Sequence, residues 1–191
     1  MWRAIICALW LAALAGAPAA QAASRQTSGA GDKALRAAIK TAERRIDARI
    51  QQVTSNAPFV LLGTTRGAYL AGYGVVFTLE VNLVPVAAIS PFRPAYTAQE
   101  IQNLNHQKRQ KLGALEASMR QLLTGEAAAL TQIPANEKIA IVVTLFNFNW
   151  EDTTGLPSQI VMQAARQALV ELQRTHAGAD AQDRAIEVKE F

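Results

Sequence analysis

The adjacent carboxylates Glu151 and Asp152 are the residues of this chain best suited to acid–base chemistry. A carboxyl group can act as a general acid or base when a dry pocket raises its pKa toward neutrality. Arg93, in an earlier loop, could hold an anion beside them. This combination would fit a small-molecule binding protein or a hydrolase, which is the alternative hypothesis for this chain. The alternative is that both carboxylates lie in a solvated loop or cap a helix.

Residues 85–96 form a proline-rich stretch with side chains suited to binding. Aromatic rings and arginine on a stiff loop lose little rotamer entropy on binding, so they make good contact residues. A second account, equally open, has Phe92 and Trp150 closing the end of the core. The candidate binding residues are Phe92, Arg93, Tyr96, Trp150, Glu151 and Asp152.

Other catalytic chemistry has little support in the sequence. The one cysteine, Cys7, lies in an apolar N-terminal run, and the chain has no Gly-x-Ser-x-Gly motif. His106 and His176 stand apart in polar helical contexts, whereas a closed metal site needs three or four converging ligands. We therefore assign no catalytic residue, no metal ligand and no cofactor, and we lean toward a non-enzymatic protein.

The first 22 residues have the layout of a secretory signal peptide. A basic start is followed by an apolar run and by the small-residue pattern Ala20-Gln-Ala22. We expect cleavage after Ala22 or Ala23, with retention as an anchor as the alternative, and no transmembrane segment after cleavage. The alanine-rich composition is typical of bacterial signals. The predicted location is therefore the periplasm, with an extracellular destination also open.

A single domain is expected over 32–191, preceded by a flexible lead-in over the small and polar residues 23–31. The formal net charge of +4 could suggest nucleic acid. However, export and the mixing of both charge signs along the helices argue against that partner.

Hydrophobic periodicity predicts one helix and two strands in the first half of the chain. Apolar residues at alternating gaps of three and four form one helical stripe, and later stretches alternate between apolar and polar residues. Glycines within the first strand predict bulges or bends. These elements are a helix over 32–53 and strands over 59–70 and 75–84, with the bulges or bends at Gly63 and Gly67.

Gly72-Tyr-Gly74 is the most conspicuous motif between these strands. A dinucleotide-binding loop needs its glycines before a helix, so that phosphate meets the helix N-terminus. These glycines lead into a strand instead. We therefore predict that they form the bend of a hairpin.

The second half of the chain predicts two more helices and two more strands. Thr97 begins a capping box, a nearly continuous apolar run indicates a buried strand, and the last residues alternate like a short edge strand. The elements are a helix over 97–123, a strand over 137–150, a helix from Pro157 or Ser158 to Gly178, and an edge strand within 184–191.

The order helix, strand, strand, helix, strand, helix, strand favours an α+β fold. We predict two layers, with a mixed four-stranded sheet and helices packed mainly on one face; the first helix could instead cover the second face. The helix over 97–123 would join two parallel strands. Ligands of open sheets of this kind bind at the carboxyl ends of the strands. The loops 85–96 and 150–156 would meet there.

Two further features carry alternative interpretations. Lys108 falls within the apolar stripe of its helix, so we expect that half of the helix to overhang the core while the lysine snorkels outward. The functional alternative is peripheral membrane contact through Lys108, Arg109 and Lys111. Phe146 and Phe148, with Trp150, form either a row in the core or an association patch on an open face.

The preferred hypothesis is a secreted, non-enzymatic domain that binds another envelope protein or associates with itself. The contact would be formed by loops 85–96 and 150–156. The alternative is a small-molecule binding protein or hydrolase that uses the crevice between the same loops.

Overall fold

A computed structural model describes residues 19–54, 59–91 and 95–191 of the chain. Most of the predicted signal peptide lies outside these residues, as do Phe92 and Arg93. The elements are α1 (Ala19–Thr54), β1 (Val60–Leu70), β2 (Gly74–Asn82), α2 (Ala98–Ala127), β3 (Lys138–Leu145), β4 (Gln159–Ala165), α3 (Arg166–Arg174), α4 (Ala179–Ala185) and β5 (Glu187–Glu190).

The strands form one mixed sheet in the order β1-β2-β3-β4-β5. The pair β2–β3 is parallel and is connected through α2, while the other three pairs are antiparallel. These pairings confirm the predicted α+β class, the mixed sheet, the N-terminal hairpin and the parallel crossover. The predicted edge strand at the end of the chain is also confirmed as β5.

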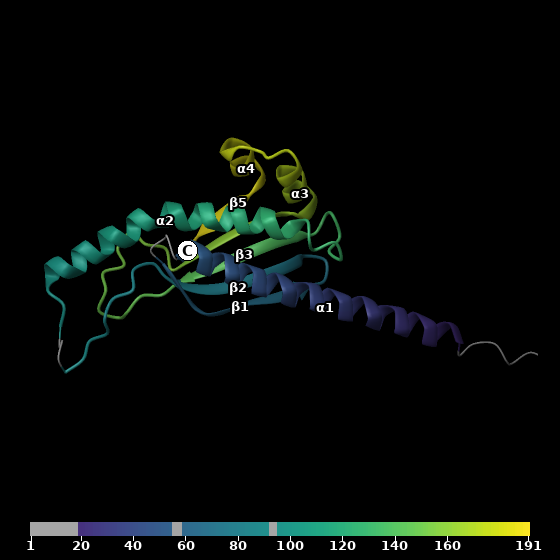
Figure 1. Cartoon of the computed structure of the whole chain (residues 1–191), viewed down its shortest axis with the longest axis horizontal. Coiled ribbons are helices and arrows are strands. Elements are labelled where there is room, and N and C mark those ends of the chain that lie inside the picture. Colours follow the sequence, from purple (N-terminus) through teal and green to yellow (C-terminus); the bar gives the residue numbers. More distant parts are fainter. Residues whose placement is uncertain (1–18, 55–58, 92–94) are drawn as a thin grey trace, which may run out of the picture.

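One face of the sheet is buried under the helices, as predicted (Figure 1). In β2 the buried residues alternate with those facing the other side, as strand geometry requires. Helices α1, α2 and α3 contribute to the same core as this face of the sheet, so the molecule has two layers. The core includes Ile39, Ala42 and Ile46 of α1, Val75, Phe77 and Leu79 of β2, Leu115 and Met119 of α2, Ile141 and Val143 of β3, and Leu169 of α3.

The predicted third helix is wrong in its first half, because residues 159–165 form β4. Ile160, Met162 and Ala164 are buried, with a period of two rather than 3.6. Alanine, glutamine and methionine do not favour strands, but pairing with β3 along the whole segment overrides that local preference. The sheet therefore has five strands, and the helix begins only at Arg166.

Three helix boundaries also differ from expectation. α1 begins at Ala19, so the backbone of the expected lead-in 23–31 is helical. α2 continues through Gly125 to Ala127 instead of stopping near Leu123. Gly178, expected to close the third helix, is the N-cap of the additional helix α4. In the described part of the chain, no helix has both the length and the apolar character needed to cross a membrane.

The hairpin bend is confirmed, and one of its two glycines, Gly74, has a second role. Gly74 has a φ of +129°, and a Cβ there would lie 1.9 Å from the carbonyl oxygen of Lys138. The backbone of β3 therefore approaches the start of β2 so closely that no side chain fits. The motif serves sheet assembly and does not form a phosphate loop.

Gly67 marks a close approach of α1 to the sheet. A Cβ at this position would lie 2.5 Å from Cγ2 of Ile39 and 2.8 Å from Cε1 of Phe77. No bulge occurs at Gly67, which pairs in register with Phe77; the register shift lies between Leu62 and Arg66, around Gly63. Gly67 is therefore a packing glycine.

We expect Gly67→Ala to lower the free energy of unfolding by roughly 1–3 kcal/mol, because the added methyl overpacks the contact between α1 and β1. Gly113→Ala is the matched control, since a Cβ there meets nothing within 4 Å inside α2. The control should gain about 0.5–1 kcal/mol from helix propensity. Urea titrations of both variants measure the difference, and equal stabilities would contradict the close packing.

Candidate functional site

The loops after β2 and β3 leave the same edge of the sheet, because these strands are parallel. Pairing extends to Val81 and Leu145, and the Phe146 N–H still donates to the Val81 carbonyl at 2.8 Å. The N-terminal half of α2 extends past the sheet above these loops (Figure 1). The predicted meeting of the two loops at one edge is therefore confirmed.

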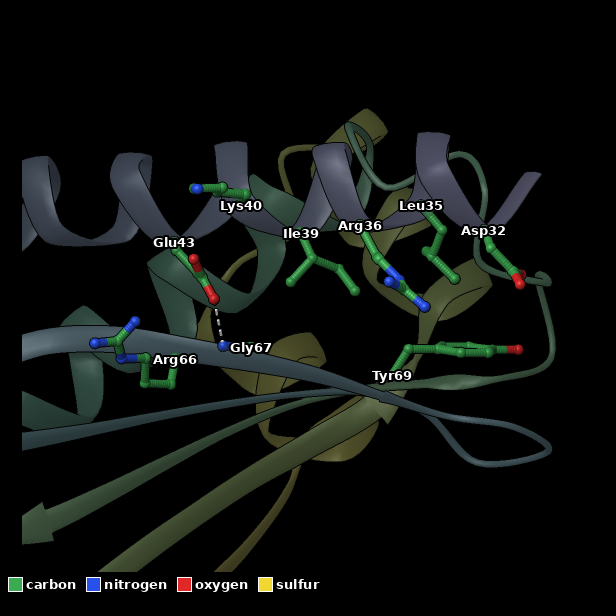
Figure 2. A pocket seen from close by; sticks show the side chains of 9 residues that line it. All are labelled: Asp32, Leu35, Arg36, Ile39, Lys40, Glu43, Arg66, Gly67 and Tyr69. Atoms are coloured by element: carbon green, nitrogen blue, oxygen red, sulfur yellow. Dashed lines mark hydrogen bonds between the residues drawn. The ribbon is translucent and has the colours of Figure 1, made fainter. Parts of the chain in front are cut away.

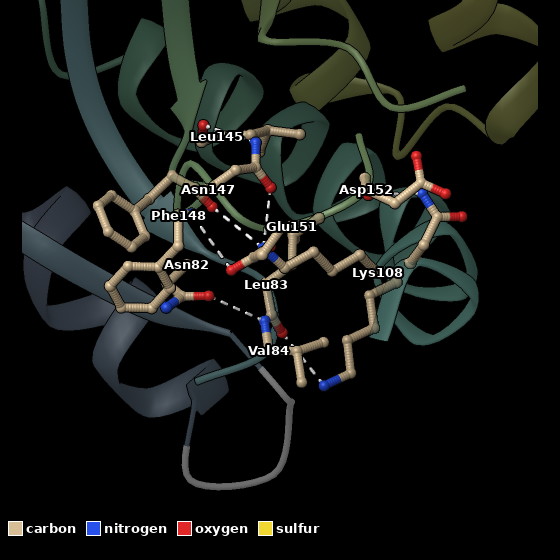
Figure 3. Close-up of polar contacts among 12 residues, drawn as sticks. Asn82, Leu83, Val84, Lys108, Leu145, Asn147, Phe148, Glu151 and Asp152 are labelled. Atoms are coloured by element: carbon tan, nitrogen blue, oxygen red, sulfur yellow. Dashed lines mark hydrogen bonds and ion pairs between the residues drawn. The ribbon is translucent and has the colours of Figure 1, made fainter. Parts of the chain in front are cut away.

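A buried ion pair connects α2 to the second loop (Figure 3). The side chains of Lys108 and Glu151 are each 1% exposed and form a salt bridge. The Lys108 ammonium also donates to Oδ1 of Asn147 at 2.8 Å and to the carbonyl of Phe146 at 3.3 Å. Glu151 accepts a further hydrogen bond from the backbone N–H of Phe148 at 3.3 Å. Three acceptors thus match the three ammonium protons.

The N-terminal half of α2 extends past the sheet, but it does not overhang the core as predicted, because Leu104 belongs to the core and Lys108 is buried. The predicted outward position of Lys108 is therefore wrong. The loop beneath α2 supplies Glu151, so the lysine is buried and paired instead of reaching solvent. Lys111 is half-buried and donates to the carbonyl of Leu83 at 3.1 Å, and burial lowers the pKa of its ammonium. Of the three residues predicted to contact a membrane, Arg109 alone is exposed, and that contact stays a prediction.

A second connection from α2 fixes the far side of the same loop. The side-chain amide of Asn105 donates to the carbonyls of Asp152, at 2.9 Å, and Thr154, at 3.1 Å. Oδ1 of Asp152 accepts the backbone N–H of Thr154 at 2.9 Å. Hydrogen bonds from Thr154 hold the pKa of the Asp152 carboxyl below its ordinary value. Asp152 is therefore ionised at neutral pH and closes a turn.

An aromatic row bridges the two loops. The rings of Tyr96 and Trp150 stack with centroids 4.2 Å apart and planes at 10°. Trp150 also stacks on Phe148 at 5.4 Å, and Phe148 meets Phe146 edge-on at 4.9 Å. All four side chains are half-buried. The row is therefore neither fully buried nor fully exposed. This result lies between the two predicted alternatives, a row in the core and an association patch on an open face.

The geometry does not suit Glu151 or Asp152 to acid–base catalysis. The side chain of Glu151 has almost no contact with solvent, and its charge is already balanced by Lys108. The pKa of the Asp152 carboxyl is lowered, whereas a general acid at neutral pH needs it raised. Within residues 19–54, 59–91 and 95–191, no three His, Cys, Asp or Glu side chains are placed to hold a metal ion.

Of the predicted contact residues, the structure brings Tyr96 and Trp150 into direct contact, while Glu151 pairs with Lys108 of α2. Phe92 and Arg93 lie outside the described residues. The sequence interpretation missed Asn105 as a site residue. One feature of the sequence did indicate the ion pair: Lys108 lies within an apolar stripe. A lysine is almost never fully buried unless it is paired, so a buried position there requires an acidic partner.

No protein-family model, curated protein or solved structure matches this chain, so its function must be inferred from its own geometry.

We expect Lys108→Met to lower the free energy of unfolding by about 3–5 kcal/mol, because it leaves the Glu151 carboxylate buried and unpaired. The double variant Lys108→Met, Glu151→Met removes both charges. It should cost less than the sum of the single changes, with a coupling of about 1–3 kcal/mol.

Urea unfolding of the four proteins in this cycle gives the coupling. Arg109→Met, an exposed change on the same helix, should stay within about 0.5 kcal/mol of the parent protein. Strictly additive effects of the two single changes would exclude an ion pair that fixes the loop.

Proposed function

We propose that this chain is a non-enzymatic domain of the cell envelope that binds another envelope protein or a second copy of itself. The contact surface comprises loops 85–96 and 150–156. One observation carries the proposal: the stacking of Tyr96 on Trp150 joins two loops that are distant in sequence. The signal-like N-terminus supports export to the periplasm.

The contacts that hold these loops in place favour a binding surface that is formed before the partner binds. Lys108 and Asn105 hold the second loop to α2, and the aromatic stack holds the first loop to the second. A loop that is already ordered loses less entropy on association. Aromatic residues are also enriched at the centres of protein interfaces.

The chemistry of the exposed part favours a protein partner. Trp150 already stacks on two rings, so part of its ring surface is occupied within the molecule. Ile89, in the first loop, is 43% exposed and adds apolar area to that loop. Ring edges and an aliphatic side chain suit the mixed packing of a protein interface.

We expect a photo-crosslinking residue at Ile89 to form one defined protein adduct in intact cells. Trp150→Ala should reduce the adduct at least about tenfold, because the loop then loses its central aromatic contact. Trp150→Phe, which keeps an aromatic ring, should retain most of it. An adduct of twice the chain mass identifies self-association, and any other mass identifies a second protein.

A probe at Arg174 is the control for position. This side chain is 70% exposed on α3, which follows β4 at the opposite end of the sheet. Equal adduct yields from Ile89 and Arg174, or a yield from Ile89 that Trp150→Ala leaves unchanged, would refute the proposed surface.

A further inference from the structure

A pocket lies between α1 and the outer strand β1, away from the loops described above (Figure 2). Its volume is about 560 Å³, within the range of about 300–1,000 Å³ that is usual for small-molecule sites. Its β1 wall runs from Arg66 to Tyr69, which pairs with the first half of β2. The loop surface follows the other end of β2, so the two sites are separate.

The frame of this pocket is held in place by packing and hydrogen bonds. Ile39 packs on Gly67, where no side chain would fit. Oε1 of Glu43 accepts the Gly67 N–H at 2.7 Å (Figure 2). The hydroxyl of Tyr69 donates to Oε1 of Glu137 at 3.2 Å. The Glu43 carboxylate therefore joins α1 to β1, and within the described residues it forms no ion pair with the nearby cations.

Three cations line the pocket without a partner. Within the described residues, the side chains of Arg36, Lys40 and Arg66 form no hydrogen bond or ion pair, and all three residues are exposed. Arg36 and Lys40 are four residues apart on α1, where like charges disfavour the helix. With Asp32 and Glu43 the lining carries one net positive charge. A ligand with a single negative charge would balance it.

The remaining lining is apolar. Leu35 and Ile39 come from α1, and the ring of Tyr69 lies across from them on β1 (Figure 2). Arg36 extends from the helix toward that ring (Figure 2). A cationic rim beside an apolar wall matches a ligand that has one charged end and one apolar end.

We propose that the α1–β1 pocket binds a singly charged oxyanion that carries an apolar portion. Guanidinium groups donate paired N–H bonds to the oxygens of a carboxylate or a phosphodiester. Leu35, Ile39 and Tyr69 take the apolar portion. Both a fatty carboxylate and an anionic phospholipid have this chemistry.

The proposal can be tested with four soluble probes: octanoate, dihexanoyl phosphatidylglycerol, octanol and acetate. Two-dimensional amide NMR of the isotopically labelled protein locates each probe, and calorimetry gives its affinity. Octanoate, the phosphatidylglycerol or both should shift amides of residues 32–43 and 66–69. Octanol lacks the charge and acetate lacks the apolar portion, so each should bind at least about tenfold more weakly. The tighter of the two amphiphiles identifies the source of the oxyanion.

Arg36→Gln and Arg66→Gln should each weaken binding of the preferred amphiphile about tenfold, the loss expected for a hydrogen bond to a charged group. Arg44→Gln is the matched control, because Arg44 is exposed on the same helix and does not line the pocket. Circular dichroism confirms that each variant is folded.

Three results would overturn the proposal. These are shifts confined to other parts of the molecule, equal affinity for octanol and octanoate, and affinity for the amphiphiles that neither Arg36→Gln nor Arg66→Gln changes. Absence of binding at millimolar probe concentrations would also overturn it. Because the loop surface does not include these residues, none of these results bears on the crosslinking outcome at Ile89.

Discussion

The salt bridge between Lys108 and Glu151 fixes the position of the loop after β3 relative to α2. Removing two charges from water costs several kcal/mol per ion, and their attraction offsets this only when every donor and acceptor is satisfied. Here Asn147 and two backbone groups complete the set. The loop after β3 must therefore pass directly beneath α2, and this course determines where Trp150 emerges and which ring of the first loop it meets.

At the β1 edge of the same sheet, the spacing of residues along α1 matches the spacing along the strand. Glu43 and Asp47 accept the backbone N–H groups of Gly67 and Thr65. Four residues of helix rise about 6 Å, and two residues of strand span about 6.7 Å. Successive turns of α1 therefore meet alternate residues of β1. Donors that could pair with another chain are occupied, which protects the edge from aggregation.

The sequence predicts this fold where local periodicity and tertiary structure agree. Clean alternation gave β2, the capping box at Thr97 gave the start of α2, and parallel pairing followed from the crossover. β4 was missed because, apart from Ile160 and Val161, its residues have little strand preference, and its identity depends on pairing with neighbours on both sides. Only one partner of the ion pair could be recognised from the sequence, because Lys108 is a charged residue on an apolar helix stripe. Its partner could not be found by spacing, because the course of a loop in space sets that contact.

Two apolar residues in place of Lys108 and Glu151 could fill the same volume, and such replacements are often neutral or stabilising by about 1–4 kcal/mol. They would not direct the loop, because apolar contacts have no preferred direction. An ammonium group with three fixed acceptors specifies the positions of Phe146, Asn147 and Glu151 together. The pair is therefore better explained by the shape it imposes on the loop than by stability. A defined loop shape would matter most in the proposed contact surface, where Trp150 and Tyr96 stack on each other.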